Sequence, residues 1–190
     1  QFYVIATPVL AAVLYGITGN INVAMILATE VMTVLILLSL VWLLRSFTRD
    51  LQSHAVCFLL LMASCIAIYG PYSVNSMLFY TQASFYACYL ITMFVVFGDY
   101  VRCLNSAKPR YGAWVLSMVL SFATGMQSMR QTVVMVLPIL ACEVYLAMRR
   151  VLQRSKLWDK TNGFRAVRVL SYGVSNVAGL LVIKWLNVPS

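Results

Sequence analysis

A short polar stretch, Gly125-Met126-Gln127-Ser128-Met129-Arg130-Gln131-Thr132, separates two apolar runs of the sequence. Arg130 carries a planar guanidinium, which binds phosphate through two parallel hydrogen bonds. If Gln131 opens the next helix, the free backbone N–H groups there add positive potential beside Arg130. We therefore predict that Arg130, Gln127 and Gln131 form a site for an anionic group. The alternative is an arginine that only reaches toward lipid phosphates.

A second polar segment, residues 69–86, mixes aromatic rings with amides and hydroxyls, among them Tyr80 and Gln82. Aromatic rings pack on the C–H faces of sugars, and amides bond to their hydroxyl groups. Tyrosine is also enriched wherever a chain crosses a membrane surface, which is the alternative explanation. We take Tyr80 and Gln82 as candidate sugar-binding residues.

Glu30 lies inside an apolar run, with Thr29 and Thr33 beside it. An ionisable group inside a membrane segment costs a few kcal/mol and is a candidate for function. Glu30 is therefore a candidate substrate-binding residue. A protonated Glu30, hydrogen-bonded to a neighbouring helix, is the structural alternative.

Two further acids have basic neighbours on their own helices. Asp99 precedes Arg102 by three residues, which places the two side chains on one helix face. Glu143 lies shortly before Arg149 and Arg150. We expect both acids to form structural ion pairs with these neighbours.

Small residues and a proline predict how two of the apolar runs pack. Ser171, Ser175 and Gly179 follow one another at four-residue spacing, which allows two helix backbones to approach closely in lipid. Pro138 falls in the middle of its apolar run and should kink that helix.

The composition excludes a water-soluble protein. Hydrophobic residues make up 62% of the chain and charged residues only 10%, so little polar surface remains for water. The net charge of +9 comes from residues between apolar runs, where they set orientation and meet anionic lipid, so we expect no nucleic acid partner. The five cysteines lack metal-ligand spacing, and no nucleotide-binding fingerprint occurs, so we expect no metal or cofactor.

Seven apolar runs organise the chain. Four of them reach the length of about 17–25 residues that a bilayer span needs. These runs predict an all-α fold, a polytopic transmembrane helical bundle of about seven membrane segments, of which one or two are short or re-entrant. Residues 1–190 should form a single transmembrane helical domain, an internal fragment of a longer protein. The runs cover roughly residues 1–17, 22–44, 55–70, 84–104, 112–125, 131–148 and 168–185.

Twelve of the fourteen Lys and Arg residues fall in every second gap between the apolar runs, and therefore on one side of the membrane. The two exceptions are Arg130 and Lys184. Because basic loops stay in the cytoplasm, we predict an integral protein of the inner or plasma membrane, with Arg130 and Lys184 on the outer side. Residues 148–168 are expected to form a cytoplasmic amphipathic helix or loop on anionic lipid. The remaining cations are Arg45, Arg49, Arg102, Lys108, Arg110, Arg149, Arg150, Arg154, Lys156, Lys160, Arg165 and Arg168.

The stretch Ser128-Met-Arg-Gln-Thr-Val-Val-Met-Val-Leu-Pro138, with Asn75 to Tyr86 before it, resembles bacterial multi-pass proteins related to the GtrII-type glucosyltransferases. Such proteins have the GT-C architecture of enzymes that use polyprenyl-phosphate-linked sugars. The resemblance implies a membrane-embedded glycosyltransferase that meets a lipid-linked sugar phosphate at the outer face. Arg130 would hold the phosphate, Gln127 and Gln131 would contact phosphate or sugar, and Tyr80 and Gln82 would line the sugar side. The catalytic acids of the family would lie outside this chain.

Two other functions remain open. A transporter or flippase of a lipid-linked or anionic substrate would use Glu30 and the kink at Pro138. A seven-span receptor is suggested by Gly19-Asn20 in the first gap and by the segment Asp99-Tyr100-Val101-Arg102, but the predicted orientation of the first run is opposite to that of such receptors.

Overall fold

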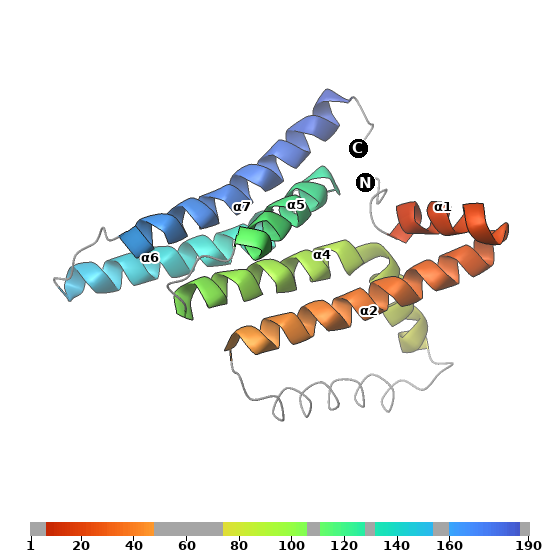
Figure 1. Ribbon diagram of the computed structural model, residues 1–190, viewed down its shortest axis with the longest axis horizontal. Coiled ribbons are helices and arrows are strands. Elements are labelled where there is room, and N and C mark those ends of the chain that lie inside the picture. The colour runs from red at the N-terminus through yellow and green to blue at the C-terminus, as the bar shows by residue number, and fades with distance from the viewer. Residues whose placement is uncertain (1–6, 48–73, 106–110, 128–131, 154–159, 187–190) are drawn as a thin grey trace. The chain divides into compact units, whose positions relative to one another are not determined.

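A computed structural model describes residues 7–47, 74–105, 111–127, 132–153 and 160–186. Within these ranges every regular element is helical and no strand occurs (Figure 1). The all-α prediction is therefore confirmed for the described part of the chain. In chain order the elements are α1 (Thr7–Thr18), α2 (Ile21–Phe47), α4 (Val74–Asn105), α5 (Tyr111–Gln127), the π-helix η1 (Thr132–Val136), α6 (Leu137–Leu152) and α7 (Lys160–Trp185).

Three helical segments among the described residues are long and apolar enough to cross a membrane: Ile21–Phe47, Tyr86–Asn105 and Asn162–Trp185. Their length and composition indicate an integral membrane protein. The count of about seven membrane segments stays a prediction. The expected run at 55–70 lies outside the described residues.

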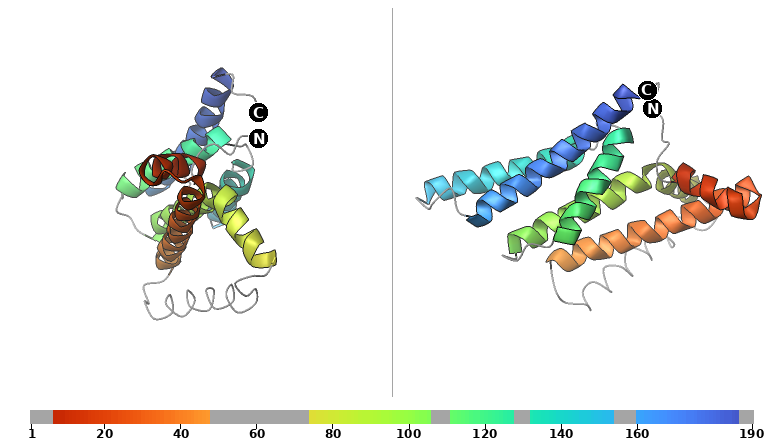
Figure 2. Two further views of the ribbon diagram at one scale, coloured as in Figure 1. Left: turned by 90° about the vertical axis from the view of Figure 1, so that its right-hand side faces the viewer. Right: turned by 45° about the horizontal axis from the view of Figure 1, so that its top comes forward.

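The chain divides into two compact units, one of Tyr3–Gly98 and one of Asp99–Ser190. In the first unit, α1 and α2 pack on each other as a helical hairpin (Figures 1 and 2). Gly19 joins them with a φ of 64°, in the left-handed region that favours glycine at the end of a helix. Asn20 then caps α2, because its Oδ1 accepts hydrogen bonds from the backbone N–H groups of Asn22 and Val23.

Helix α4 approaches α2 closely within the first unit. A Cβ atom added at Gly98 would lie 2.7 Å from Cδ1 of Trp42 and 3.1 Å from Oγ of Ser46. The absence of a side chain at Gly98 therefore leaves room for the Trp42 ring between α4 and α2.

The second unit is built around a close contact between α5 and α7. A Cβ at Gly125 would overlap the backbone of Asn176, and one at Gly179 would overlap the backbone of Phe122. Asn176 is 1% exposed and donates a hydrogen bond of 2.9 Å to the carbonyl oxygen of Ser121. This contact is the close helix approach predicted from Ser171, Ser175 and Gly179, and the role of Gly179 in it is confirmed.

A hydrogen bond between two side chains also stabilises this contact of α5 with α7. Trp114 on α5 donates from Nε1 to Oγ of Ser171 at 2.7 Å, and Ser171 donates in turn to the backbone oxygen of Arg168 at 2.6 Å. Ser171 thus connects α5 to the first turns of α7.

The interruption predicted at Pro138 takes a specific form. Residues 132–136 form the π-helix η1, and Pro138 follows in the first turn of α6. Proline is tolerated in a first helical turn, where its missing N–H group is not needed. Pro138 therefore lies near the start of α6, whereas the sequence suggested the middle of a single helix.

Two helices begin earlier than the apolar runs suggested. Helix α7 begins at Lys160 and α6 ends at Leu152, so the expected cytoplasmic segment at 148–168 is largely divided between these two helices. Helix α4 begins at Val74, within the gap expected at 71–83. In both places polar side chains lowered the hydropathy of residues that are helical.

Candidate functional site

The most buried charged group of the described chain lies near the start of α7 and is formed with α4. Arg168 donates from Nε and Nη2 to the two carboxylate oxygens of Asp99, at 3.0 and 2.7 Å. Tyr172, one helical turn further along α7, donates its hydroxyl to Asp99 Oδ2 at 2.5 Å. The side chains of Arg168 and Asp99 are only 4% and 2% exposed. Such a two-pronged pair has the geometry in which arginine binds carboxylate most strongly.

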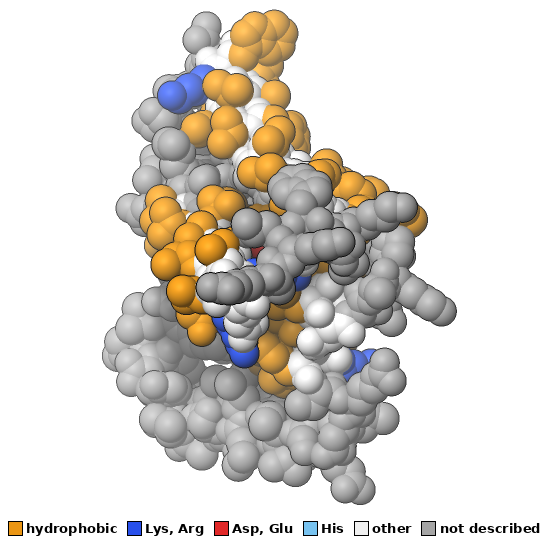
Figure 3. Space-filling view, turned by 90° about the vertical axis from the view of Figure 1, so that its left-hand side faces the viewer, with side chains coloured by type: hydrophobic (Ala, Val, Ile, Leu, Met, Phe, Trp, Pro, Cys, Tyr) orange, Lys and Arg blue, Asp and Glu red, His pale blue; other side chains and the backbone are white. Residues whose placement is uncertain are grey.

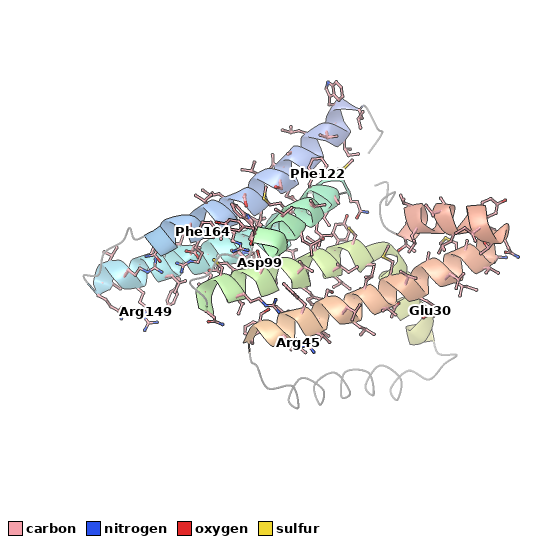
Figure 4. The ribbon with its side chains drawn as sticks, in the orientation of Figure 1. Glu30, Arg45, Asp99, Phe122, Arg149 and Phe164 are labelled. Atoms are coloured by element: carbon pink, nitrogen blue, oxygen red, sulfur yellow. The ribbon has the colours of Figure 1, made fainter. Side chains whose placement is uncertain are left out.

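Aromatic rings lie close to the Arg168 guanidinium. Its Cζ atom is 5.7 Å from the ring centre of Trp114 and 5.9 Å from that of Phe164. The two rings meet edge to face with their centres 5.5 Å apart. Figure 4 labels Phe164 and Asp99 in this part of the second unit. The rings add cation–π attraction and help to keep the charge away from lipid.

A second group repeats the arrangement on α6. Arg165 donates from Nε to Glu143 Oε1 at 2.5 Å and from Nη2 to Oε2 at 3.0 Å. Tyr100 on α4 donates its hydroxyl to Glu143 Oε1 at 2.9 Å. Each group therefore contains one arginine, one carboxylate and one tyrosine. We call the two together the charge cluster: Asp99, Tyr100, Glu143, Arg165, Arg168 and Tyr172.

Three residues of the charge cluster come from a single face of α7, as helix periodicity requires. Arg165, Arg168 and Tyr172 follow one another by three and four residues and so share one face of α7. Asp99 and Tyr100 are adjacent on α4. The cluster therefore joins α4, α6 and α7 at the end of the unit where α4 ends and α7 begins.

The partners of the two acids differ from those we expected. Asp99 was expected to pair with Arg102 on its own helix, and Glu143 with Arg149 or Arg150. The structure gives each acid a bidentate arginine partner on α7, at positions that the sequence assigned to a cytoplasmic segment, and Arg102 acts on Asp99 in addition. An arginine with a bidentate carboxylate partner can be buried, and a hydropathy count does not include that compensation.

The charge cluster is suited to holding helices together and is poorly suited to base catalysis. Each carboxylate already accepts two hydrogen bonds from arginine and one from tyrosine. A general base needs a carboxylate oxygen that is free to take a proton from a substrate. Among the acids that the structure describes, Glu30 alone lies outside the cluster.

The predicted anion site lies partly within the described chain. Gln127 is the last residue of α5 and is 9% exposed. Arg130 and Gln131 lie outside the described residues, and η1 begins at Thr132, directly after them. Both helices that border the predicted site thus belong to the second unit.

The other predicted site residues belong to the first unit. Tyr80 and Gln82 lie within α4, in a stretch whose side chains are outside the described part. Glu30 lies on α2, where its side chain is exposed (Figure 4). The hydrogen bonds next to it stay within the helix, from Thr29 to the Met25 carbonyl and from Thr33 to the Thr29 carbonyl.

The fold and the charge cluster define a helical membrane protein with paired charges inside one of its units. Comparison with protein-family models, curated proteins and solved structures gives no match for this chain. In the part of the chain that the structure describes, no three His, Cys, Asp or Glu residues are grouped in a way that would hold a metal ion.

Proposed function

We propose that this chain is the donor-binding part of a membrane glycosyltransferase that uses a sugar linked to polyprenyl phosphate. In this proposal Arg130 binds the phosphate, and Gln127 and Gln131 bind phosphate or sugar. Tyr80 and Gln82 contribute to the sugar side, and the basic loops face the cytoplasm, which places Arg130 at the outer face.

The observation that supports the proposal most is the helix geometry on either side of Arg130. Helix α5 ends at the buried Gln127, and the next element begins as a π-helix at Thr132. Short π-helical stretches occur frequently at functional sites. The polar sequence between these two elements contains the cation Arg130, whose guanidinium is suited to an anionic ligand.

Asp99 and Glu143 fit a role in holding helices together better than a role in catalysis. Asp99 and Glu143 are engaged by arginines and tyrosines. The base that activates the acceptor hydroxyl is proposed to lie outside this chain, as the resemblance implies.

Replacing Arg130 with lysine should lower sugar transfer by about ten- to a hundredfold. Lysine keeps the charge but loses the planar fork, and a hydrogen bond to a charged group contributes about 1.5–3 kcal/mol. The measurement is transfer of labelled sugar from a panel of polyprenyl-phosphate-linked hexoses, in membranes that contain the complete protein.

Arg149→Lys is the matched control, since Arg149 is an exposed arginine near the end of α6. It should leave transfer unchanged. Full activity in Arg130→Ala would show that Arg130 does not bind the donor.

A transporter or flippase is the second candidate, and the exposed Glu30 within the apolar helix α2 favours it. An acid at such a position is typical of proton-coupled pathways. If the chain is a transporter, Glu30→Gln should abolish proton-driven uptake of an anionic substrate into vesicles, while the neighbouring Thr33→Val should retain it. Equal uptake in Glu30→Gln and in the unchanged protein would exclude this role.

A further inference from the structure

An open apolar groove runs along α7 in the second unit. It has a volume of about 410 Å³, within the range of about 300–1,000 Å³ that is usual for ligand sites. Val136 of η1 and Leu140 of α6 form one wall. The other wall is formed by side chains that follow one another along a single stripe of α7, chiefly Leu170, Val174, Val177 and Leu181.

The depth of the groove depends on Gly173. A Cβ there would lie 3.4 Å from Cγ1 of Val136, so a larger side chain would fill the space between η1 and α7. Val174, next to Gly173, is 68% exposed although it is apolar. In a helix that is long and apolar enough to cross a membrane, such a surface faces hydrocarbon. Figure 3 shows hydrophobic side chains over most of the described surface toward the C-terminal end of α7.

The length of the groove matches one leaflet of a bilayer. The eleven-residue step from Leu170 to Leu181 spans about 17 Å, at about 1.5 Å per residue. Half of a hydrocarbon core of about 30 Å is about 15 Å. A single fatty acyl chain of a phospholipid would therefore fit the groove along its length.

A cation lies just beyond one end of the groove. Lys184 follows Leu181 by three residues, which places it on the same stripe of α7, and its side chain is exposed. Trp185 comes next and is 82% exposed. A Lys-Trp pair at a helix end is typical of the level of the lipid headgroups. The stripe therefore combines one wall of the apolar groove with a positive charge at the level of the lipid headgroups.

We propose that this groove binds one anionic phospholipid of the surrounding bilayer, with an acyl chain along α7 and its phosphate at Lys184. The wall residues are apolar, so the tail supplies contact area, and Lys184 selects for the negative headgroup. The proposed transferase reaction is not required for this site, because the lipid is bound without being changed.

Native mass spectrometry of the purified membrane protein tests the site with two lipids of identical acyl chains, phosphatidylglycerol and phosphatidylcholine. Phosphatidylglycerol should be retained about fivefold better, since one basic residue near the surface contributes about 1 kcal/mol toward an anionic lipid. Lys184→Gln should remove this preference. Arg149→Gln, which removes an exposed cation elsewhere, should keep it.

A second pair of variants tests the groove itself. Val174→Trp should fill it and reduce the retention of both lipids, whereas Val167→Trp, at an exposed position of α7 outside the groove, should not. Equal retention of the two lipids, a preference that survives Lys184→Gln, or full retention in Val174→Trp would each overturn the proposal. If polyprenyl phosphate is added and is retained while neither phospholipid is, the proposal would be overturned as well.

Discussion

Replacing Asp99 with alanine should lower the stability of the second unit by about 3–5 kcal/mol, because Arg168 would remain buried without its carboxylate. Tyr172 would lose its acceptor at the same time. The melting temperature in detergent, followed by size-exclusion chromatography with fluorescence detection, should fall by an amount on the order of 10 °C or more. We expect this to be the largest effect of any single side-chain removal in the charge cluster.

A double replacement separates the loss of the pair from the loss of packing. Asp99→Leu with Arg168→Met removes both charges together, and replacing a buried ion pair by apolar residues is often neutral or stabilising. The double variant should therefore recover most of the melting temperature. Glu30→Gln serves as the control, since Glu30 is exposed, and it should change stability by less than about 0.5 kcal/mol. A single Asp99→Ala variant that melts like the unchanged protein would contradict a stabilising pair.

Gly179→Leu should have a comparable effect for a steric reason. A Cβ at position 179 would overlap the backbone of Phe122, and a backbone cannot rotate aside as a side chain can. Inserting a larger group into a closely packed interface costs about 1–3 kcal/mol, and more where nothing can yield. The same thermal measurement should show a lower melting temperature for Gly179→Leu, and Gly125→Leu should behave alike, since its Cβ would meet the backbone of Asn176.

Gly112 provides the matched comparison for these glycines. It also lies in α5, but nothing is within 4 Å of an added Cβ. Gly112→Leu should therefore leave the melting temperature nearly unchanged or raise it slightly, because glycine is a poor helix former. If all three leucine variants melt at the same temperature, the contact of α5 with α7 does not depend on the two glycines.

The sequence predicted the helices well and their ends less well. Apolar runs identified α2, α5 and α7, since length and hydrophobicity determine which segments are stable in lipid. The four-residue spacing that ends in Gly179 predicted a close interface, and the structure places α5 against it. The early start of α7 was missed because Arg165 and Arg168 lower the hydropathy of its first turns.

The pairing of charges could not be predicted from the sequence alone, because it depends on which helices lie next to each other. Asp99 had a basic neighbour on its own helix, and local spacing favoured that partner. One signal was present: Arg165, Arg168 and Tyr172 share a helix face that leads into an apolar run. Such a stripe indicates that a polar face must be covered by another part of the protein.

The candidate anion site was predicted from the contrast between one polar hinge and its apolar surroundings. The π-helix that follows Arg130 and Gln131 was not foreseen, because π-helices have no strong sequence pattern and depend on local packing. The site residues Tyr80 and Gln82 were expected in a gap between two apolar runs, and their backbone is helical in α4. Aromatic and amide side chains are compatible with both structures.

The charge cluster has a consequence for the biogenesis of this protein. Asp99 and Glu143 leave the ribosome before Arg165 and Arg168, which are carried by the last described helix. Before α7 is synthesised, the carboxylates of Asp99 and Glu143 lack their arginine partners. A buried arginine at the centre of a membrane helix adds about 2.5–3.5 kcal/mol to the free energy of insertion, so α7 enters more readily once those carboxylates are in place. In a nascent chain that ends before α7, both acids would lack their arginine partners, and we expect such a chain to be a substrate for membrane quality control.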